Sequence, residues 1–395
     1  MSLNGYVHKA VIISLYAPGI GIARSLGRAG IRVIALESNM NIPGVHCRYC
    51  TVEYCADIED KKILVATLIR LAEKEKYKPV LYLTNDVQLK IVSEARDILS
   101  EFYFFVLPDS KTIDILLEKS LFNEFAEKEC LPIPQTIILR DNEKLNSGSI
   151  AFPCVIKPNY RPAEWFNYFP VKAYKVTTAE QCDEVVETIR KCYKGELLIQ
   201  EWIPGDDSHI YFYFAYYSQE GNLLEHFTGR KLLQWPPSLG NTCIGESIEC
   251  EPIKEVSRRL FDAVGYRGYG SVEFKLDLRD GIFKIMEPTV GRFNYQTQLI
   301  LLQGANIPLA YYCDLVRIEY KSKKSDHKVM WIDEGSLLQY ISSYGIRGFL
   351  TWDFFGKVLF YKKGFAYFCW KDLKPFWFFT LSKLRVIWRK VLKIE

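Results

Sequence analysis

The stretch from residue 270 to residue 292, GSVEFKLDLRDGIFKIMEPTVGR, constrains the fold more than any other part of the chain. Apolar and charged residues alternate along it, before and after an Asp-Gly pair at positions 280 and 281. A period of two indicates β-strands, and Asp-Gly is typical of a tight hairpin turn. We therefore predict an antiparallel hairpin, with Glu273 near the middle of one strand and Glu287 at the end of the other.

The first ninety residues predict a different arrangement. Apolar runs at 9–15 (KAVIISL), 31–37 (IRVIALE) and 79–86 (PVLYLTND) alternate with helical patterns at 22–30 and 61–76. The segment APGIG (17–21) between the first strand and the first helix is interpreted as a tight turn. A β-α-β-α-β order predicts a parallel sheet, with loops that face a ligand at the carboxyl ends of its strands.

From residue 111 the pattern becomes mixed. One helix is expected over 111–129, and strands are expected at 136–140, 152–158 and 196–205. A second helix is expected over 177–195, and a hairpin is expected from 210–218 and 222–232. After residue 325 the chain becomes aromatic and ends in a basic tail. The predicted fold of the chain is therefore mixed, α/β and α+β. We expect three units, at residues 1–112, 113–325 and 326–395.

Several charged residues are placed where a phosphate and a metal ion could be held. Lys119 lies in the helical pattern and Lys157 ends an apolar strand. Apolar neighbours would therefore anchor the aliphatic stem of each lysine side chain. Glu273 and Glu287 supply the oxygen ligands that Mg²⁺ prefers. Two lysines and paired carboxylates suit a nucleoside triphosphate with its metal ion.

Four motifs in this order resemble the ATP-grasp superfamily, in particular carboxylate–amine ligases of the D-aspartate ligase and ATP-grasp carboligase type. They are LLEKSLF (116–122), CVIKP (154–158), LIQEWIPGDD (198–207) and the pair VEFKLD (272–277) and IMEPTVGR (285–292). The resemblance covers roughly residues 8–320. It implies a Rossmann-like domain that precedes a two-lobed ATP-grasp fold, followed by the aromatic C-terminal extension. It also implies ATP and Mg²⁺ or Mn²⁺ as cofactors, and small-molecule carboxylate and amine substrates.

The resemblance also implies a role for each matching residue. Lys119 and Lys157 would contact the ATP phosphates, and Asp207 would bind the ribose hydroxyls. Glu273 would bind one metal ion and Glu287 would bridge two. The remaining implied roles are adenine binding by Gln200, Glu201 and Ile203, and contact with the γ-phosphate or the acyl-phosphate by Arg230, Lys231 and Arg292.

The sequence departs from the family pattern at three places, the mildest of which is Glu118 in place of the commoner aspartate before the first lysine. The asparagine expected two residues after the bridging glutamate is Thr289, and Asn294 is the candidate to replace it as a metal ligand. The loop over the phosphates, residues 159–174 (NYRPAEWFNYFPVKAY), contains no glycine, although glycine lets backbone amides approach a phosphate. Arg161 or Lys172 would then assist. These departures leave an alternative open, which is a catalytically weak or inactive nucleotide-binding regulatory protein.

A weaker motif lies near the N-terminus. GIGIAR (19–24) follows a strand, and Glu37 ends the next strand, which is suggestive of a dinucleotide-binding fingerprint. The third glycine of that fingerprint is missing. We therefore interpret the two glycines as sites of close strand–helix packing.

The bulk composition excludes some classes of function. The net charge of +4 equals that of the tail, residues 376–395, where five basic residues oppose one acid. The body is therefore neutral, and a nucleic-acid partner is not expected. Eleven cysteines scattered singly favour a reducing cytoplasm, and no apolar run is long enough to span a membrane.

The tail has the pattern of an amphipathic helix. Its apolar stripe consists of Trp377, Leu381, Leu384, Trp388 and Val391. Such a stripe with basic neighbours predicts either peripheral contact of residues 376–395 with the inner membrane surface or packing on the aromatic segment 352–370. A homodimer contact is the third possibility.

Overall fold

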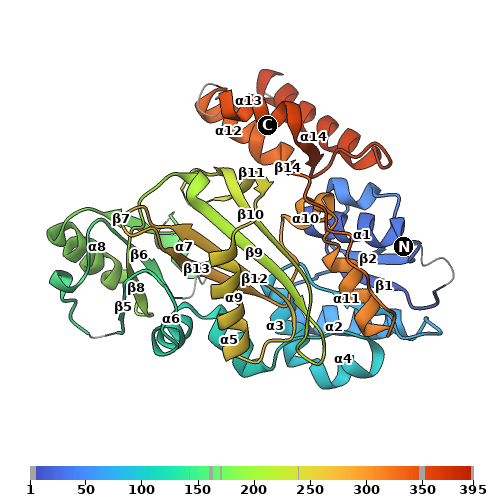
Figure 1. Ribbon diagram of the computed structural model, residues 1–395, viewed down its shortest axis with the longest axis horizontal. Coiled ribbons are helices and arrows are strands. Elements are labelled where there is room, and N and C mark those ends of the chain that lie inside the picture. Colours follow the sequence, from blue (N-terminus) through green and yellow to red (C-terminus); the bar gives the residue numbers. More distant parts are fainter. Residues whose placement is uncertain are drawn as a thin grey trace.

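The computed structural model describes residues 6–141, 143–159, 163–169, 171–238, 240–346 and 352–392 (Figure 1). Its first unit is a parallel sheet of order β3-β2-β1-β4, as the sequence predicts. Its strands are β1 (Ala10–Ile13), β2 (Val33–Glu37), β3 (Thr51–Tyr54) and β4 (Val80–Tyr82). Its helices are α1 (Ala17–Arg28), α2 (Lys61–Ala72), α3 (Asp86–Glu94) and α4 (Arg96–Phe102), with the 3₁₀ helix η1 at Pro43–His46.

The expected turn at residues 17–21 lies inside α1. Pro18 occupies the first turn of this helix, where its fixed φ angle is already helical and its missing N–H costs nothing. A Cβ atom at Gly19 would lie 2.0 Å from the carbonyl oxygen of Ser14, and one at Gly21 would lie 3.1 Å from the side chain of Thr297. The glycines therefore let α1 pack closely, which supports the packing interpretation.

The second unit is an antiparallel sheet of order β5-β8-β6-β7. Its strands are β5 (Thr136–Leu139), β6 (Cys154–Pro158), β7 (Tyr174–Val176) and β8 (Leu197–Glu201). Helices α7 (Ala163–Tyr168) and α8 (Ala179–Cys192) belong to this unit, as does η2 (Ser147–Ser149). Thr178 caps α8 by accepting a hydrogen bond from the N–H of Gln181.

The single helix expected over 111–129 is two helices, α5 (Ser110–Leu117) and α6 (Lys119–Lys128). Glu118 between them is extended, with φ of −85° and ψ of 120°. The start of α6 is held from outside the helix, because the side chain of Asn159 accepts a hydrogen bond from the N–H of Ser120 at 2.9 Å. This contact spans 39 residues of sequence, so local periodicity does not reveal the break.

The largest sheet has seven strands in the order β13-β12-β9-β10-β11-β14-β15. Its strands are β9 (Ile210–Tyr217), β10 (Leu223–Trp235), β11 (Asn241–Ser247), β12 (Gly268–Leu276), β13 (Phe283–Val290), β14 (Val329–Ile332) and β15 (Lys362–Phe365). Helix α9 (Glu251–Ala263) packs on the face that carries Tyr211 and Tyr213. Helices α10 (Thr297–Gln303) and α11 (Ile307–Leu315) pack on the face that carries Phe212 and Phe214. The 3₁₀ helix η3 (Asp207–His209) precedes β9.

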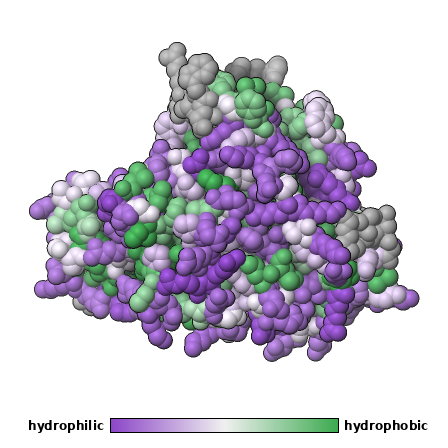
Figure 2. All heavy atoms as spheres, viewed as in Figure 1, coloured by the Kyte–Doolittle hydropathy of each residue, from purple (hydrophilic) through white to green (hydrophobic). Residues whose placement is uncertain are grey.

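The C-terminal extension joins this sheet. It contributes the edge strands β14 and β15, and it adds α12 (Glu334–Tyr344), α13 (Trp352–Phe360) and α14 (Lys374–Leu392). Figure 1 shows these helices together at one end of the molecule, and Figure 2 shows hydrophobic side chains on the surface of the same region. Among the described residues no helix is long and apolar enough to cross a membrane.

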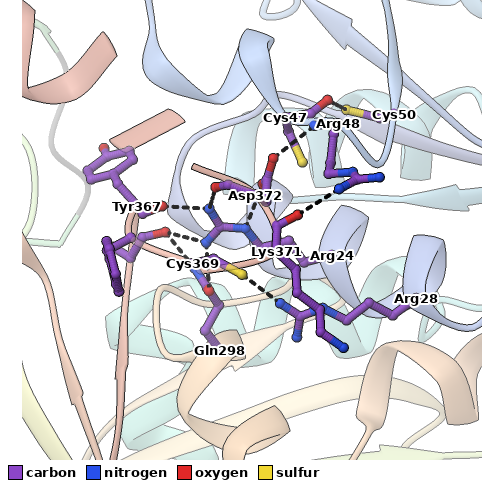
Figure 3. Close-up of polar contacts among 12 residues, drawn as sticks. Arg24, Arg28, Cys47, Arg48, Cys50, Gln298, Tyr367, Cys369, Lys371 and Asp372 are labelled. Atoms are coloured by element: carbon purple, nitrogen blue, oxygen red, sulfur yellow. Dashed lines mark hydrogen bonds and ion pairs between the residues drawn. The ribbon is translucent and has the colours of Figure 1, made fainter. Parts of the chain in front are cut away.

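A buried ion pair fastens the extension to the N-terminal unit (Figure 3). Arg24 of α1 and Asp372 are 1% and 3% exposed, and the Nε atom of Arg24 lies 2.9 Å from Oδ2 of Asp372. The same guanidinium donates to the carbonyl oxygens of Ala366 and Tyr367 and to Oε1 of Gln298 on α10. The other carboxylate oxygen of Asp372 accepts from the N–H of Arg48. Three segments that are distant in sequence therefore share one satisfied charge pair.

We predict that Asp372→Asn lowers the free energy of unfolding by about 3–5 kcal/mol, because Arg24 is then a buried charge without its counter-ion. Denaturant-induced unfolding measures the change. The control is Glu94→Gln, which removes the exposed pair between Lys61 and Glu94 and should cost less than about 1 kcal/mol. Equal effects of the two substitutions would contradict this role of the buried pair.

Candidate active site

A cavity of about 340 Å³ lies between the four-stranded sheet and the seven-stranded sheet, with strands of both in its wall. It is lined by β6 and β8 of the smaller sheet and by β9, β10, β12 and β13 of the larger one. Most of the residues to which the motifs assign roles meet here, although they come from four separate stretches of the chain. They are Lys157, Gln200, Glu201, Ile203, Lys231, Glu273, Glu287, Arg292 and Asn294.

The two glutamates of the hairpin are direct cross-strand partners. Glu273 of β12 pairs with Glu287 of β13, and the register shifts at the next position. Lys231 of β10 is 3% exposed, and its Nζ atom lies 2.8 Å from Oε2 of Glu273. Like charges directly opposite in a sheet are destabilising, and Lys231 offsets the charge of one of the two glutamates. This arrangement is costly for the fold alone and is suited to binding a cation.

The chemistry of these ligands fits Mg²⁺. Mg²⁺ is usually held by one or two carboxylates, with water and phosphate oxygens completing its coordination. Within the described part of the chain, no group of three or more His, Cys, Asp or Glu residues could hold a metal ion. Glu273 and Glu287 would therefore share the ion with oxygens of a bound phosphate.

Asn294 is already hydrogen-bonded at both ends of its amide. Its Oδ1 atom accepts from Nη1 of Arg292 at 3.1 Å, and its Nδ2 atom donates to Oγ of Ser271 at 2.9 Å. Arg292 also forms an ion pair with Asp86 at the start of α3, with 2.7 Å between Nε and Oδ1. The N-terminal unit therefore orients Arg292, and Asn294 acts in this structure as its partner. Thr289, which takes the place of the expected asparagine, also lines the cavity.

The opposite wall carries the second lysine and the polar strand end. Nζ of Lys157 donates to Oε1 of Gln200 at 2.9 Å, and Nε2 of Gln200 donates to Thr136. Glu201 accepts from the backbone N–H of Gln135 and forms an ion pair with Arg279. The side chain of Ile203 is buried. This strand end offers an apolar surface beside backbone and amide hydrogen-bonding groups, as an aromatic base requires.

Lys119 and Asp207 lie outside the lining of this cavity. Nζ of Lys119 donates to the carbonyl oxygen of Asn159 at 2.9 Å, at the start of α6. Asp207 accepts two hydrogen bonds from Gln234, one from Nε2 at 2.7 Å and one from the backbone N–H at 3.1 Å. Gln234 itself lines the cavity, so Asp207 contacts a residue of the cavity wall and does not line the cavity directly. Phosphate binding by Lys119 and ribose binding by Asp207 remain predictions.

Arg230 lies on the opposite face of the sheet from Lys231. Consecutive residues of a strand point to opposite faces, so Arg230 and Lys231 cannot both face one phosphate. Lys231 points into the cavity, whereas Nε of Arg230 forms an ion pair with its cross-strand partner Glu246. Arg230 lines a separate cavity of about 320 Å³ instead. This placement does not support contact of Arg230 with a phosphate in the first cavity, and that contact remains a prediction.

The motifs do not point to Lys275 and Trp202, which also line the cavity. Lys275 is 7% exposed, and its burial lowers the pKa of the ammonium group. The Nζ atoms of Lys275 and Lys175 lie 4.9 and 4.1 Å from the centroid of the Trp202 ring. Both cation–π contacts place positive charge around the ring. The signal available in the sequence is the period of two, which puts Lys275 on the face of Glu273.

Part of the loop without glycine, Ala163–Tyr168, forms the helix α7. Trp165 of α7 is fully buried in the core of the smaller sheet, and its Nε1 atom donates to the carbonyl oxygen of Val171 at 2.8 Å. Lys172, which belongs to the same loop, lines the cavity. Arg161 lies outside the described residues. The buried side chain of Trp165 therefore anchors this loop. Of the two expected basic residues, Lys172 lies at the site.

Comparison with known proteins places this architecture in a class. No protein-family model matches the sequence. A D-aspartate ligase of Enterococcus faecium (strain Aus0004) is 27% identical over 341 residues, which is 79% of each chain. This similarity and the fold confirm the resemblance to ATP-grasp carboxylate–amine ligases that the four motifs indicate.

Three solved structures share the fold at about 14% identity. The ADP complex of the N5-carboxyaminoimidazole ribonucleotide synthetase purK has a TM-score of 0.62 and covers 82% of this chain and 81% of its own. The biotin carboxylase domain of the Hydrogenobacter thermophilus 2-oxoglutarate carboxylase, with MgADP, has a TM-score of 0.62 and covers 82% and 74%. The L-amino acid ligase of Bacillus licheniformis has a TM-score of 0.57 and covers 80% and 75%.

We predict that Glu287→Gln raises the free energy of unfolding of the ligand-free protein by about 0.2–1 kcal/mol, because it removes the repulsion from Glu273. Denaturant-induced unfolding in the presence of a chelator measures the change. Glu53→Gln, at an exposed site on β3, is the control and should change stability by less than about 0.5 kcal/mol. A clear loss of stability in Glu287→Gln would show that the two carboxylates do not repel each other.

Proposed function

We propose that this protein is an ATP-dependent carboxylate–amine ligase that forms an amide and releases ADP and phosphate. The observation that carries the proposal is the Glu273–Glu287 pair, set in register beside Lys231 in the cavity that also holds Lys157 and Gln200. Carboxylates suited to a metal ion, lysines suited to phosphate and a strand end suited to a base all line that one cavity. The similarity to a D-aspartate ligase supports the same chemistry.

In the proposed reaction, an oxygen of the substrate carboxylate attacks the γ-phosphorus of ATP, and the bond from that phosphorus to the β–γ bridging oxygen breaks. ADP leaves and an acyl-phosphate forms. The amine nitrogen then attacks the acyl carbon, the carbon–oxygen bond to phosphate breaks, and the nitrogen loses a proton. Mg²⁺ held by Glu273 and Glu287 would supply charge neutralisation at the phosphates.

The other residues act by position and charge. Lys157 and Lys231 place positive charge on two walls of the cavity. Arg292 is held by Asp86 and Asn294, so its guanidinium is already oriented before a substrate binds. Preorganised cations of this kind stabilise charge that develops on transferred phosphoryl oxygens. No nucleophilic side chain is required.

We propose that one of the two substrates is an amino acid. The relative with 27% identity is named for D-aspartate, so D-aspartate is the first candidate.

All eleven cysteines are free thiols, which fits the reducing cytoplasm as the place where the enzyme works. The alternative of an inactive regulatory protein is not favoured, because the carboxylate pair and the lysines that turnover requires are present in the cavity.

The test is incubation with ATP, Mg²⁺, a pool of carboxylates from cell extract and a panel of D- and L-amino acids, followed by mass spectrometry and nucleotide chromatography. We predict amide products with one ADP per bond, because acyl-phosphate formation breaks the β–γ linkage. Glu287→Gln should abolish the reaction, and Glu273→Gln should reduce it less. AMP with pyrophosphate, or undiminished ADP from Glu287→Gln, would contradict the proposal.

A matched pair of neighbours tests which face of β10 serves the nucleotide. We predict that Lys231→Met weakens MgATP binding at least about tenfold, because a charge-assisted contact is lost. Arg230→Met should lower the melting temperature, because Glu246 loses its cross-strand partner, and should leave the dissociation constant within about twofold. Titration calorimetry and thermal unfolding give the two readouts. Weakened binding in Arg230→Met alone would restore the assignment made from the sequence.

A further inference from the structure

The last helix docks on the protein through one face and leaves the other uncovered. Phe379 of α14 is 6% exposed and stacks on Tyr367, with 4.7 Å between ring centroids. Trp377, Leu381 and Leu384 are 57%, 47% and 46% exposed, and their spacings of four and three put them on one stripe. These exposures do not support full packing of the three side chains on residues 352–370, and that alternative stays a prediction. The side chains of Trp388 and Val391 lie outside the described part.

The stripe continues into a second exposed tryptophan. Trp370 is 81% exposed, and its ring lies 4.9 Å from that of Phe368. Phe368 contacts Phe376 at 5.2 Å, and Phe376 contacts Trp377 at 6.3 Å. A chain of ring contacts therefore joins the two tryptophans. We call Trp370, Trp377, Leu381 and Leu384 the apolar ridge.

The exposed charge along the segment that carries the apolar ridge has one sign. From residue 355 to residue 385 the only acid is Asp372, which is 3% exposed and paired with Arg24. Five basic residues in the same range are exposed, and they are Lys362, Lys363, Lys371, Lys374 and Arg385. The last helix and the loop before it thus present exposed tryptophans and leucines among cations, with no exposed acid. Residues 355–385 carry a net charge of +6, so the rest of the chain is slightly acidic, at −2.

We propose that the apolar ridge binds the surface of an anionic lipid bilayer. Tryptophan is favoured at the boundary between headgroups and acyl chains, and lysine and arginine are attracted to anionic headgroups. An interfacial helix with an apolar face and basic flanks binds in the plane of that boundary. The contact is peripheral, because no described helix is able to cross a membrane. It does not depend on the proposed ligase activity.

A second copy of the chain fits this surface less well. A two-fold symmetric contact places the same patch against itself, so the cations around the ridge would face one another. Like charges across an interface oppose association. An anionic bilayer buries the same apolar side chains and also neutralises the basic ones. Charge complementarity therefore favours the lipid surface.

The test is co-sedimentation of the full chain with vesicles of equimolar phosphatidylglycerol and phosphatidylcholine, compared with phosphatidylcholine alone. We expect binding only to the anionic vesicles and weaker binding at high salt. Trp370→Ala with Trp377→Ala should lower the partition coefficient at least about tenfold. Lys371→Gln with Lys374→Gln should lower it roughly 30-fold.

Two control substitutions at other exposed sites should leave binding unchanged. They are Tyr54→Ala, at an aromatic residue that is 59% exposed on β3, and Lys62→Gln, at an exposed lysine on α2. Thermal unfolding and nucleotide binding without vesicles show that each variant is folded. Absence of sedimentation by the unaltered chain at low salt overturns the proposal. A concentration-dependent dimer that the tryptophan substitutions abolish overturns it in favour of a second copy.

Discussion

The alternation of side chains along β10 is the constraint on which the arrangement of this protein depends. β10 lies near the centre of the seven-stranded sheet and has antiparallel neighbours on both sides. Lys231 on one face reaches Glu273, and Arg230 on the other face reaches Glu246. Neither residue can exchange faces without a shift of register that would also move the apolar core. The strand therefore separates the charge that we propose to be catalytic from a structural charge one residue away.

The proposed active site is built at a cost to the fold. Two carboxylates are opposed in register, and a nearly buried lysine compensates one of them. A protein selected only for stability has no use for this arrangement, since repulsion across a strand pair lowers the free energy of unfolding. A bound metal ion removes the repulsion. The unfavourable pair is thus the feature that most directly indicates function.

The C-terminal extension is tied to the body in two ways. β14 and β15 extend the large sheet, and Asp372 is held by Arg24 of the first helix. This leaves α14 fixed along one face, with its apolar stripe directed away from the core. A segment that is attached to the body and still exposes two tryptophans and two leucines is suited to present them to a surface. The ion pair between Arg24 and Asp372 therefore holds in place the segment that we propose contacts the membrane.

The sequence by itself determined the parallel N-terminal sheet, the hairpin with its two glutamates and the set of motifs that meet in the cavity. It did so because periods of two and of 3.6 residues, and turn residues such as Asp-Gly, are local properties of the chain. Tertiary structure decided the rest. The break at Glu118 depends on Asn159, and the orientation of Arg292 depends on Asp86, which are contacts across 39 and 206 residues. Whether Arg230 or Lys231 reaches the cavity depends on which face of β10 the smaller sheet covers. No local pattern carries that information, because a strand has the same alternation whichever of its faces is covered.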